Sequence, residues 1–325
     1  MTPVNTSNKS FNENHFFSIV FENDKPFGGF LGSGIALISL ASVICDPVRI
    51  GLRSLDSHFK NIQIYDLGYL KVINQETIHK IISLCISFGV VPVFTGYELS
   101  QESIENMNSQ DFIVSNHIYH GNTECNYIAY QRHLCKMDDI HIAEEHRYDT
   151  ISLGKMRSNP NLLEPVLRDI DLLFVDLQAL RTSEAPNIQF TYPTGLQAEE
   201  ICQILKYAGM GCKIRGVFFQ AMLRTGLSGQ EVDLIAESIW YFAEGINIRL
   251  NDHPEKSTDH TQFILHSPSQ DVDLEFFKHN QTSKWWLKHP SSQVGTKYLA
   301  CSYEEYQSSM DEELPERILK FINNS

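Results

Sequence analysis

Residues 171–208 constrain the fold of this chain more than any other stretch. A short apolar run, Leu172 to Val175, ends at Asp176. An apolar run of this length that is bounded by charge predicts a buried strand. A polar loop follows, and apolar residues then recur at the spacing of one helical face, at Ile201, Ile204, Leu205 and Ala208. A buried strand followed by an amphipathic helix is typical of α/β proteins.

Two capping signals give the expected ends of this helix. Thr194 is followed three residues later by Gln197, which is the spacing of a capping box, so we expect the helix to open at Thr194. Gly209 follows the last apolar position, where a glycine commonly ends a helix.

The rest of the chain repeats the alternation of strand and helix. Apolar runs predict strands at 35–41, 62–67, 90–94, 111–115, 149–153 and 214–219. Helical periodicity predicts helices at 77–88, 161–167 and 229–249. Pro92 is an unusual residue for the 90–94 strand, because a central strand seldom tolerates proline. The alternation predicts an α/β fold with a mainly parallel sheet.

We expect three segments along the chain. Residues 1–34 are polar and then glycine-rich, and should wrap the outside of the α/β domain at 35–250. Residues 251–325 should form an aromatic-rich extension of irregular segments that packs on the same domain. Trp285 and Trp286 in this extension either fill a groove within the chain or anchor a contact with a partner.

Composition excludes some classes of partner. The chain has 26 basic and 40 acidic side chains and a formal net charge of -14, which argues against nucleic-acid binding. The seven cysteines are an odd number without a C-x-x-C pair, so we expect reduced thiols in a cytoplasm. The apolar run at 30–45 is interrupted by glycine and shorter than the about 20 residues of a membrane span, and no signal peptide is evident. We therefore expect neither nucleic acid nor membrane as a partner.

Asp176 marks the first candidate site. The carboxyl ends of strands are where open α/β sheets usually place their chemistry. Asp176 ends the predicted strand, and Gln178, Arg181 and Glu184 follow in the next loop. These four residues are the first pocket candidates, although a single Asp more often simply ends a strand.

The same stretch resembles the ureohydrolase family of arginases, agmatinases and formimidoylglutamases. That family carries a strand reading S-F-D-V-D-x-L-D-P, then a loop, then a small-Pro pair and a Gly-Leu pair before a helix. Residues 175–181 occupy the D-V-D-x-L-D segment, and Ala185-Pro186 and Gly195-Leu196 match the later pairs. The run at 177–186 and the A-G-M at 208–210 are most similar to a Bacteroidetes formimidoylglutamase-like branch. The resemblance implies a single three-layer αβα domain.

The resemblance also implies a metal site that can be compared residue by residue. Family members hold two divalent metals, usually manganese, whose bridging hydroxide attacks a guanidinium or formimino carbon. Their ligands come from strand ends reading G-G-D-H-S, D-A-H-x-D and D-x-D. In the first motif this chain has Leu99 in place of the metal-binding His, with Glu98 beside it. In the second, His117 matches the central His, while Ser115 and Tyr119 replace both aspartates.

The third motif and a later segment show further losses. Asp176 is kept, but Gln178 replaces the second Asp, and Arg181 stands where the family often has a third. Gln220 ends a segment that in the family ends in Glu. Asp176 and His117 thus remain as candidate metal ligands, and Glu98 and Gln220 join the pocket candidates.

We interpret the chain as a non-catalytic pseudoenzyme that lacks the dimanganese centre, needs no cofactor, and acts by binding or assembly. The alternative is an active hydrolase of a formimino or guanidino C–N bond that uses Mn²⁺ and differently aligned ligands. A third possibility is a metal-free small-molecule binder in which Arg181 pairs with a ligand carboxylate. In a metal-free site we expect Asp176 to bind Arg181 or a backbone N–H of the following loop.

The chain also carries features that suit assembly, and family members are commonly oligomers. In the predicted 229–249 helix, Trp240 and Tyr241 are adjacent and point to different sides. Only one side of the helix can pack on the sheet, so the aromatic residue on the other side must be covered by another segment. The Trp285-Trp286 pair is a candidate for that cover. We expect a homodimer or larger closed assembly to which the chain beyond Asn251 contributes. A monomer whose tail folds back on its own helix is the alternative.

Overall fold

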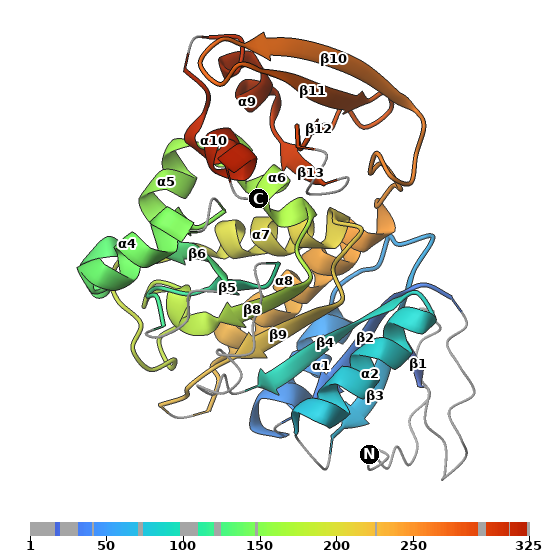
Figure 1. Cartoon of the computed structure of the whole chain (residues 1–325). Helices are drawn as coiled ribbons and strands as arrows, with labels where there is room; N and C mark the ends of the chain where they lie inside the picture. The colour runs from blue at the N-terminus through green and yellow to red at the C-terminus, as the bar shows by residue number, and fades with distance from the viewer. Residues whose placement is uncertain are drawn as a thin grey trace.

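The computed structural model describes residues 17–19, 32–40, 42–70, 74–97, 110–119, 125–146, 149–224, 226–291, 297–311 and 313–323. These residues form two sheets, one of nine strands and one of four (Figure 1). None of the described helices combines the length and the apolar character needed to cross a lipid bilayer.

The nine-stranded sheet is parallel at every strand pair, as the alternation of strand and helix predicts. Its strand order is β1-β3-β2-β4-β9-β8-β5-β6-β7. The strands are β1 (Phe17–Ile19), β2 (Gly34–Ser39), β3 (Gln63–Tyr69), β4 (Val90–Tyr97), β5 (Phe112–Val114), β6 (Asn126–Tyr130), β7 (Ile151–Ser152), β8 (Leu172–Asp176) and β9 (Gly216–Gln220). The strands β1 and β6 were not predicted. β1 lies within the expected wrapping segment 1–34, of which only residues 17–19 and 32–34 are among the described residues.

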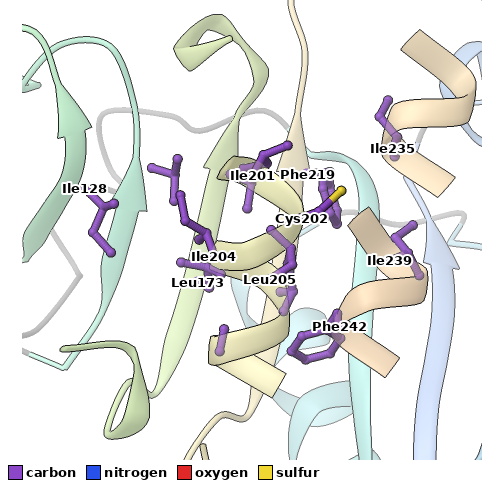
Figure 2. Close-up of a cluster of buried hydrophobic side chains, with 14 of the residues drawn as sticks. Ile128, Leu173, Ile201, Cys202, Ile204, Leu205, Phe219, Ile235, Ile239 and Phe242 are labelled. Carbon is purple, nitrogen blue, oxygen red and sulfur yellow. The ribbon is translucent and has the colours of Figure 1, made fainter. Parts of the chain in front are cut away.

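Helices cover both faces of this sheet and complete the three layers. One face packs against α1 (Ser42–Ser54), α5 (Leu153–Ser158), α6 (Leu163–Arg168), α7 (Ala198–Met210) and α8 (Gly229–Asn247). The other face packs against α2 (Gln75–Ser87) and α4 (Met137–His146). Figure 2 shows α7 beside α8 on this face of the sheet, with Ile204 and Leu205 among the buried side chains. The three-layer α/β class is therefore confirmed.

The ends of α7 differ from the two capping predictions. Gln197 is the N-cap, and its capping box is completed by Glu200. Thr194 instead donates its hydroxyl to Gln131 Oε1 at 2.6 Å, so it ties the preceding loop to another segment. Gly209 lies inside the helix, where a Cβ atom would come within 2.3 Å of the Phe242 carbonyl oxygen. Close packing of α7 on α8, not helix termination, thus requires glycine at 209.

Pro92 lies within a central strand of the sheet. β4 runs between β2 and β9, and Pro92 is opposite Ala36 of β2. Pairing with β9 begins only at Val93, so Pro92 stands just outside the paired segment on that side. A proline is tolerated there because the missing N–H interrupts no pairing with β9.

The extension is regular, so the expectation of irregular segments was wrong. It forms an antiparallel sheet in the order β10-β11-β12-β13, covered on one face by helices. The elements are β10 (His260–Ser267), β11 (Val272–His279), β12 (Trp285–Lys288), β13 (Tyr298–Cys301), α9 (Tyr303–Ser308) and α10 (Glu316–Asn323). Trp285 and Trp286 are only 5% and 1% exposed, so they fill the interior of the chain.

Trp240 of α8 contacts the segment that follows α1. Its indole N–H donates to the Asp56 carbonyl oxygen at 2.8 Å, and its ring packs on Phe59 at 5.2 Å between centroids. The segment after α1 thus supplies the contact that the sequence analysis assigned to Trp285 and Trp286.

Two buried arginines fix the small sheet to the large domain. Arg168 of α6 pairs with Glu164, donates to the Trp285 carbonyl oxygen at 2.7 Å and lies over the Trp286 ring. Arg317 of α10 pairs with Asp149 before β7 and donates to the Ala300 carbonyl oxygen at 2.8 Å. Both cations cross between the sheets with their hydrogen bonds satisfied, which makes the junction specific.

Candidate functional site

A cleft of about 410 Å³ opens at the carboxyl edge of the large sheet. Strands β5, β8 and β9 are neighbours, and because they are parallel the segments that follow them meet at one edge. This is the edge at which open α/β sheets usually bind ligands. The cleft is lined by Asn116, His117, Tyr119, Leu134, Gln178, Phe190, Tyr192, Gln220 and Met222.

Asp176 lies beneath the floor of this cleft, and both of its carboxylate oxygens accept hydrogen bonds. Tyr119 Oη donates to Oδ2 at 2.7 Å, and the backbone N–H of Gln178 donates to Oδ1 at 3.0 Å. Gln220 Nε2 donates to Tyr119 Oη at 3.2 Å. The ends of three neighbouring strands are thereby joined through one buried carboxylate. A backbone N–H of the following loop does bind Asp176, as expected, whereas Arg181 does not.

Burial governs the titration of this group. Removal from water raises the pKa of Asp176 to about 6, although the hydrogen bonds from Tyr119, Gln178 and Gln220 act in the opposite direction. Burial, and then the nearby Asp176 charge, also raise the pKa of Tyr119 above its usual range. Tyr119 is therefore protonated at neutral pH and acts as a donor to Asp176.

A second chain of hydrogen bonds fixes the state of His117. The amide nitrogen of Asn116 donates to the Gln178 carbonyl oxygen at 2.8 Å and to the Phe190 carbonyl oxygen at 3.2 Å. Asn116 Oδ1 therefore faces His117 Nδ1, 2.7 Å away, and that nitrogen must carry the proton. Burial lowers the pKa of His117, so the ring is neutral and Nε2 is a hydrogen-bond acceptor.

The predicted site residues divide into two groups. His117, Gln178 and Gln220 line the cleft, above the buried Asp176. Arg181 and Glu184 pair with each other, with Arg181 Nε 2.8 Å from Glu184 Oε1, and neither lines the cleft. Glu98 and Leu99 follow β4 in the chain and lie outside the described residues.

Sequence reasoning missed the walls of the cleft. Phe190 and Tyr192 come from the loop after β8, and Met222 follows β9. Phe190 is 56% exposed and adopts a positive φ of 56°, which is uncommon for an aromatic residue. The sequence offered one usable signal, since the loop between strand and helix contains two aromatic residues in the run Phe190-Thr191-Tyr192.

No family model and no curated protein matches the chain. Formiminoglutamase from Trypanosoma cruzi matches with a TM-score of 0.56 at 14% identity, over 67% of this chain and 94% of that chain. Formimidoylglutamase from Bacillus subtilis matches with a TM-score of 0.53 at 13% identity, over 74% of this chain and 95% of that chain.

Agmatine ureohydrolase from Thermoplasma volcanium matches with a TM-score of 0.52 at 16% identity, over 66% of this chain and 89% of that chain. This chain has the ureohydrolase fold. At these identities the likeness defines the architecture, and the function must be argued from the residues of the site.

The described residues of this ureohydrolase-fold site do not fit a pair of divalent metals. Such a pair needs several carboxylates to balance its charge. The cleft and its floor offer the single carboxylate of Asp176, whose two oxygens already accept hydrogen bonds. Its neighbours are the phenol of Tyr119 and the neutral amides of Gln178 and Gln220. Within the described part of the chain, no group of three or more His, Cys, Asp or Glu side chains is arranged to hold a metal ion.

Proposed function

We propose that this chain is a ureohydrolase-fold pseudoenzyme that holds no dimanganese centre and binds a small molecule in the cleft at the carboxyl edge. The observation that supports this most is the environment of Asp176. The one carboxylate that matches a ligand of the family accepts hydrogen bonds on both oxygens from Tyr119 and Gln178. A buried, fully satisfied polar network is a stable alternative to metal binding.

The residues that replace the family's acidic ligands form one hydrogen-bond network with Asp176. Tyr119 stands where the family resemblance places a metal-binding aspartate. Its hydroxyl donates a hydrogen bond to a carboxylate oxygen of Asp176, the kind of atom that would otherwise give its electron pair to a metal ion. Gln220 replaces a glutamate in the same comparison and supports the Tyr119 hydroxyl. The loss of acidic ligands is therefore coupled to the gain of donors that stabilise the remaining carboxylate by hydrogen bonding.

The chemistry of the cleft indicates the class of ligand. Its described lining contains no Arg, Lys, Asp or Glu, and Phe190, Tyr192 and Met222 give it apolar walls. Neutral hydrogen-bonding groups, Gln178 and His117 Nε2 among them, form the floor. A small molecule with a flat apolar side and an uncharged N–H edge fits these walls and this floor. Because Arg181 lies outside the lining, pairing with a ligand carboxylate is not part of the proposal.

Metal analysis tests the pseudoenzyme half of the proposal. Protein purified with added manganese and passed through a desalting column should carry well below one manganese per chain by elemental mass spectrometry. About two tightly bound ions per chain, the content of a dimetal site, would overturn it in favour of the hydrolase.

A thermal-shift screen tests the binding half. We expect uncharged amides and imidazole compounds to raise the Tm more than glutamate, arginine or agmatine at equal concentration. Phe190→Ala should abolish the shift. Phe88→Ala is a matched control, because Phe88 is 42% exposed at the end of α2, away from the cleft lining. Absence of any shift across neutral and charged compounds would count against a binding role.

A further inference from the structure

The outer strand of the small sheet is an open edge. In the order β10-β11-β12-β13, β10 pairs with β11 on one side only, and no described strand pairs with its other side. Figure 1 places β10 at the end of the molecule that is remote from the carboxyl edge of the large sheet. An edge strand presents unpaired N–H and C=O groups that another strand can bind.

The hydrogen-bond pattern identifies which groups face outward. The backbone N–H of Asn280 donates to the Asp259 carbonyl oxygen at 3.0 Å, so residues 259 and 280 form a hydrogen-bonded pair. The regular antiparallel register from His260↔His279 to Ser267↔Val272 makes hydrogen-bonded pairs alternate along β10. The odd-numbered residues therefore bind β11, and the backbone groups of Gln262, Ile264 and His266 point away from it.

This edge lacks the usual protection against pairing. β10 reads HTQFILHS and contains no Lys, Arg, Asp, Glu or Pro. Ile264, at its middle, is 63% exposed. Natural edge strands normally carry a charge, a proline or a bulge that prevents association. In a chain with a net charge of -14, an uncharged exposed strand is a surface on which a second copy meets little repulsion.

The strand is also symmetric in its chemistry about Ile264. Moving outward from that residue, Phe263 mirrors Leu265, Gln262 mirrors His266, and Thr261 mirrors Ser267. Pro268 follows and has no N–H, so it ends the symmetric segment. A two-fold axis at Ile264 would place apolar side chains against apolar side chains and hydroxyls against hydroxyls. The outward direction of the Ile264 backbone groups is the one that this register requires.

We propose that two copies of this chain pair antiparallel through β10, with Ile264 of one copy opposite Ile264 of the other. The contact joins the two four-stranded sheets into one continuous sheet. The segment 261–267 forms about six main-chain hydrogen bonds across the axis. Phe263 and Leu265 extend the buried core on one face, and the two Ile264 side chains cover each other on the opposite face. The occupant is a second copy because only its own sequence reproduces the symmetry.

Sedimentation velocity over a concentration series tests the contact. An interface of this size predicts a reversible dimer that forms in roughly the micromolar range. Ile264→Lys places two positive charges on the axis and should leave a monomer, weakening dimerisation at least about tenfold. Ile50→Lys is the matched control, because Ile50 is an equally exposed isoleucine, at 68%, on α1, and this variant should dimerise like the native chain.

A charge-swap experiment tests the register itself. Ile264→Lys and Ile264→Glu should each be monomeric alone, and an equimolar mixture should form a heterodimer, because the two side chains then form a cross-strand ion pair. An unchanged circular dichroism spectrum and a single cooperative thermal transition would show that each variant is folded, with a Tm that can be lower than that of the native dimer. A native chain that stays monomeric to about 100 µM overturns the proposal, as does an Ile264→Lys variant that dimerises normally. Failure of the mixture to associate overturns the two-fold register.

Discussion

The two sheets of this protein differ in the kind of binding surface that they leave accessible. The large parallel sheet is covered by helices on both faces, and its cleft lies beyond the carboxyl ends of β5, β8 and β9. The small antiparallel sheet ends at the edge strand β10, which pairs with β11 alone among the described strands. Parallel strands bring loops together at a common edge, whereas an antiparallel sheet leaves a strand of main-chain groups. One geometry thus suits a small ligand, and the other suits a second strand.

Loss of Arg317, one of the two arginines that join the sheets, should have the largest effect. Arg317→Met leaves Asp149 and Glu305 buried without their cation, which should lower the free energy of unfolding by about 3–5 kcal/mol. In a urea titration, tryptophan fluorescence reports mainly on Trp285 and Trp286 in the small sheet. In the variant, the fluorescence transition should then occur at a lower urea concentration than the unfolding transition followed by far-UV circular dichroism. Lys80→Met, which removes a well-exposed pair with Glu76, should cost less than about 0.5 kcal/mol. Equal losses in the two variants would show that the junction is not buried in solution.

The carboxylate under the cleft should make stability depend on pH. Because the pKa of Asp176 is about 6 in the fold and near 3.8 when unfolded, its protonated form stabilises the fold below pH 4. That contribution, up to about 3 kcal/mol, is lost as the pH rises through 6. Asp176→Asn removes this titration. The free energy of unfolding of the variant, relative to that of the native chain, should therefore increase as the pH is raised from 4 to 7.5. Urea unfolding at both pH values measures it.

The manganese content of the same variant checks the absence of a metal role. It should equal that of the native chain after purification with added manganese. A fall on replacing Asp176 would contradict the proposed function.

The helix layer behind the large sheet should be sensitive to a single methyl group. Gly209→Ala forces α7 away from the Phe242 carbonyl oxygen of α8 and should destabilise the chain by about 1–3 kcal/mol. Gly154→Ala provides the control, because a Cβ at 154 in α5 meets nothing within 4 Å. Thermal unfolding of both variants measures the difference. If they have equal Tm values, close packing is not the reason for glycine at 209.

The pair beside the cleft should have the smallest effect. Arg181 and Glu184 are partly exposed, so Arg181→Met should change the free energy of unfolding by less than about 1 kcal/mol. Ligand-induced thermal shifts should be unchanged, because Arg181 does not line the cleft. A shift that disappears in this variant would restore the idea that Arg181 receives the ligand.

The sequence determined the class of the large domain because burial and periodicity are local. The run Leu172 to Asp176 and the periodic helix at 229–249 are recognisable without knowledge of their neighbours, and the structure confirms both as β8 and α8. Candidate residues at strand ends could be named for the same reason. The pattern of the small sheet was overlooked, although β11 alternates buried Leu274 and Phe276 with more exposed residues.

Only the tertiary structure decided which groups meet. Tyr119 binds Asp176 across 57 positions of sequence because β5 lies next to β8, and strand order cannot be deduced from either segment alone. The same holds for Asn116, which orients His117 only because the Gln178 and Phe190 carbonyl oxygens lie beside it. Glycine is required at 209 because α8 packs closely against α7 there. Arg181 pairs with Glu184 and does not line the cleft. Long-range hydrogen bonds depend on how strands are ordered in space, and local sequence patterns carry no information about that order.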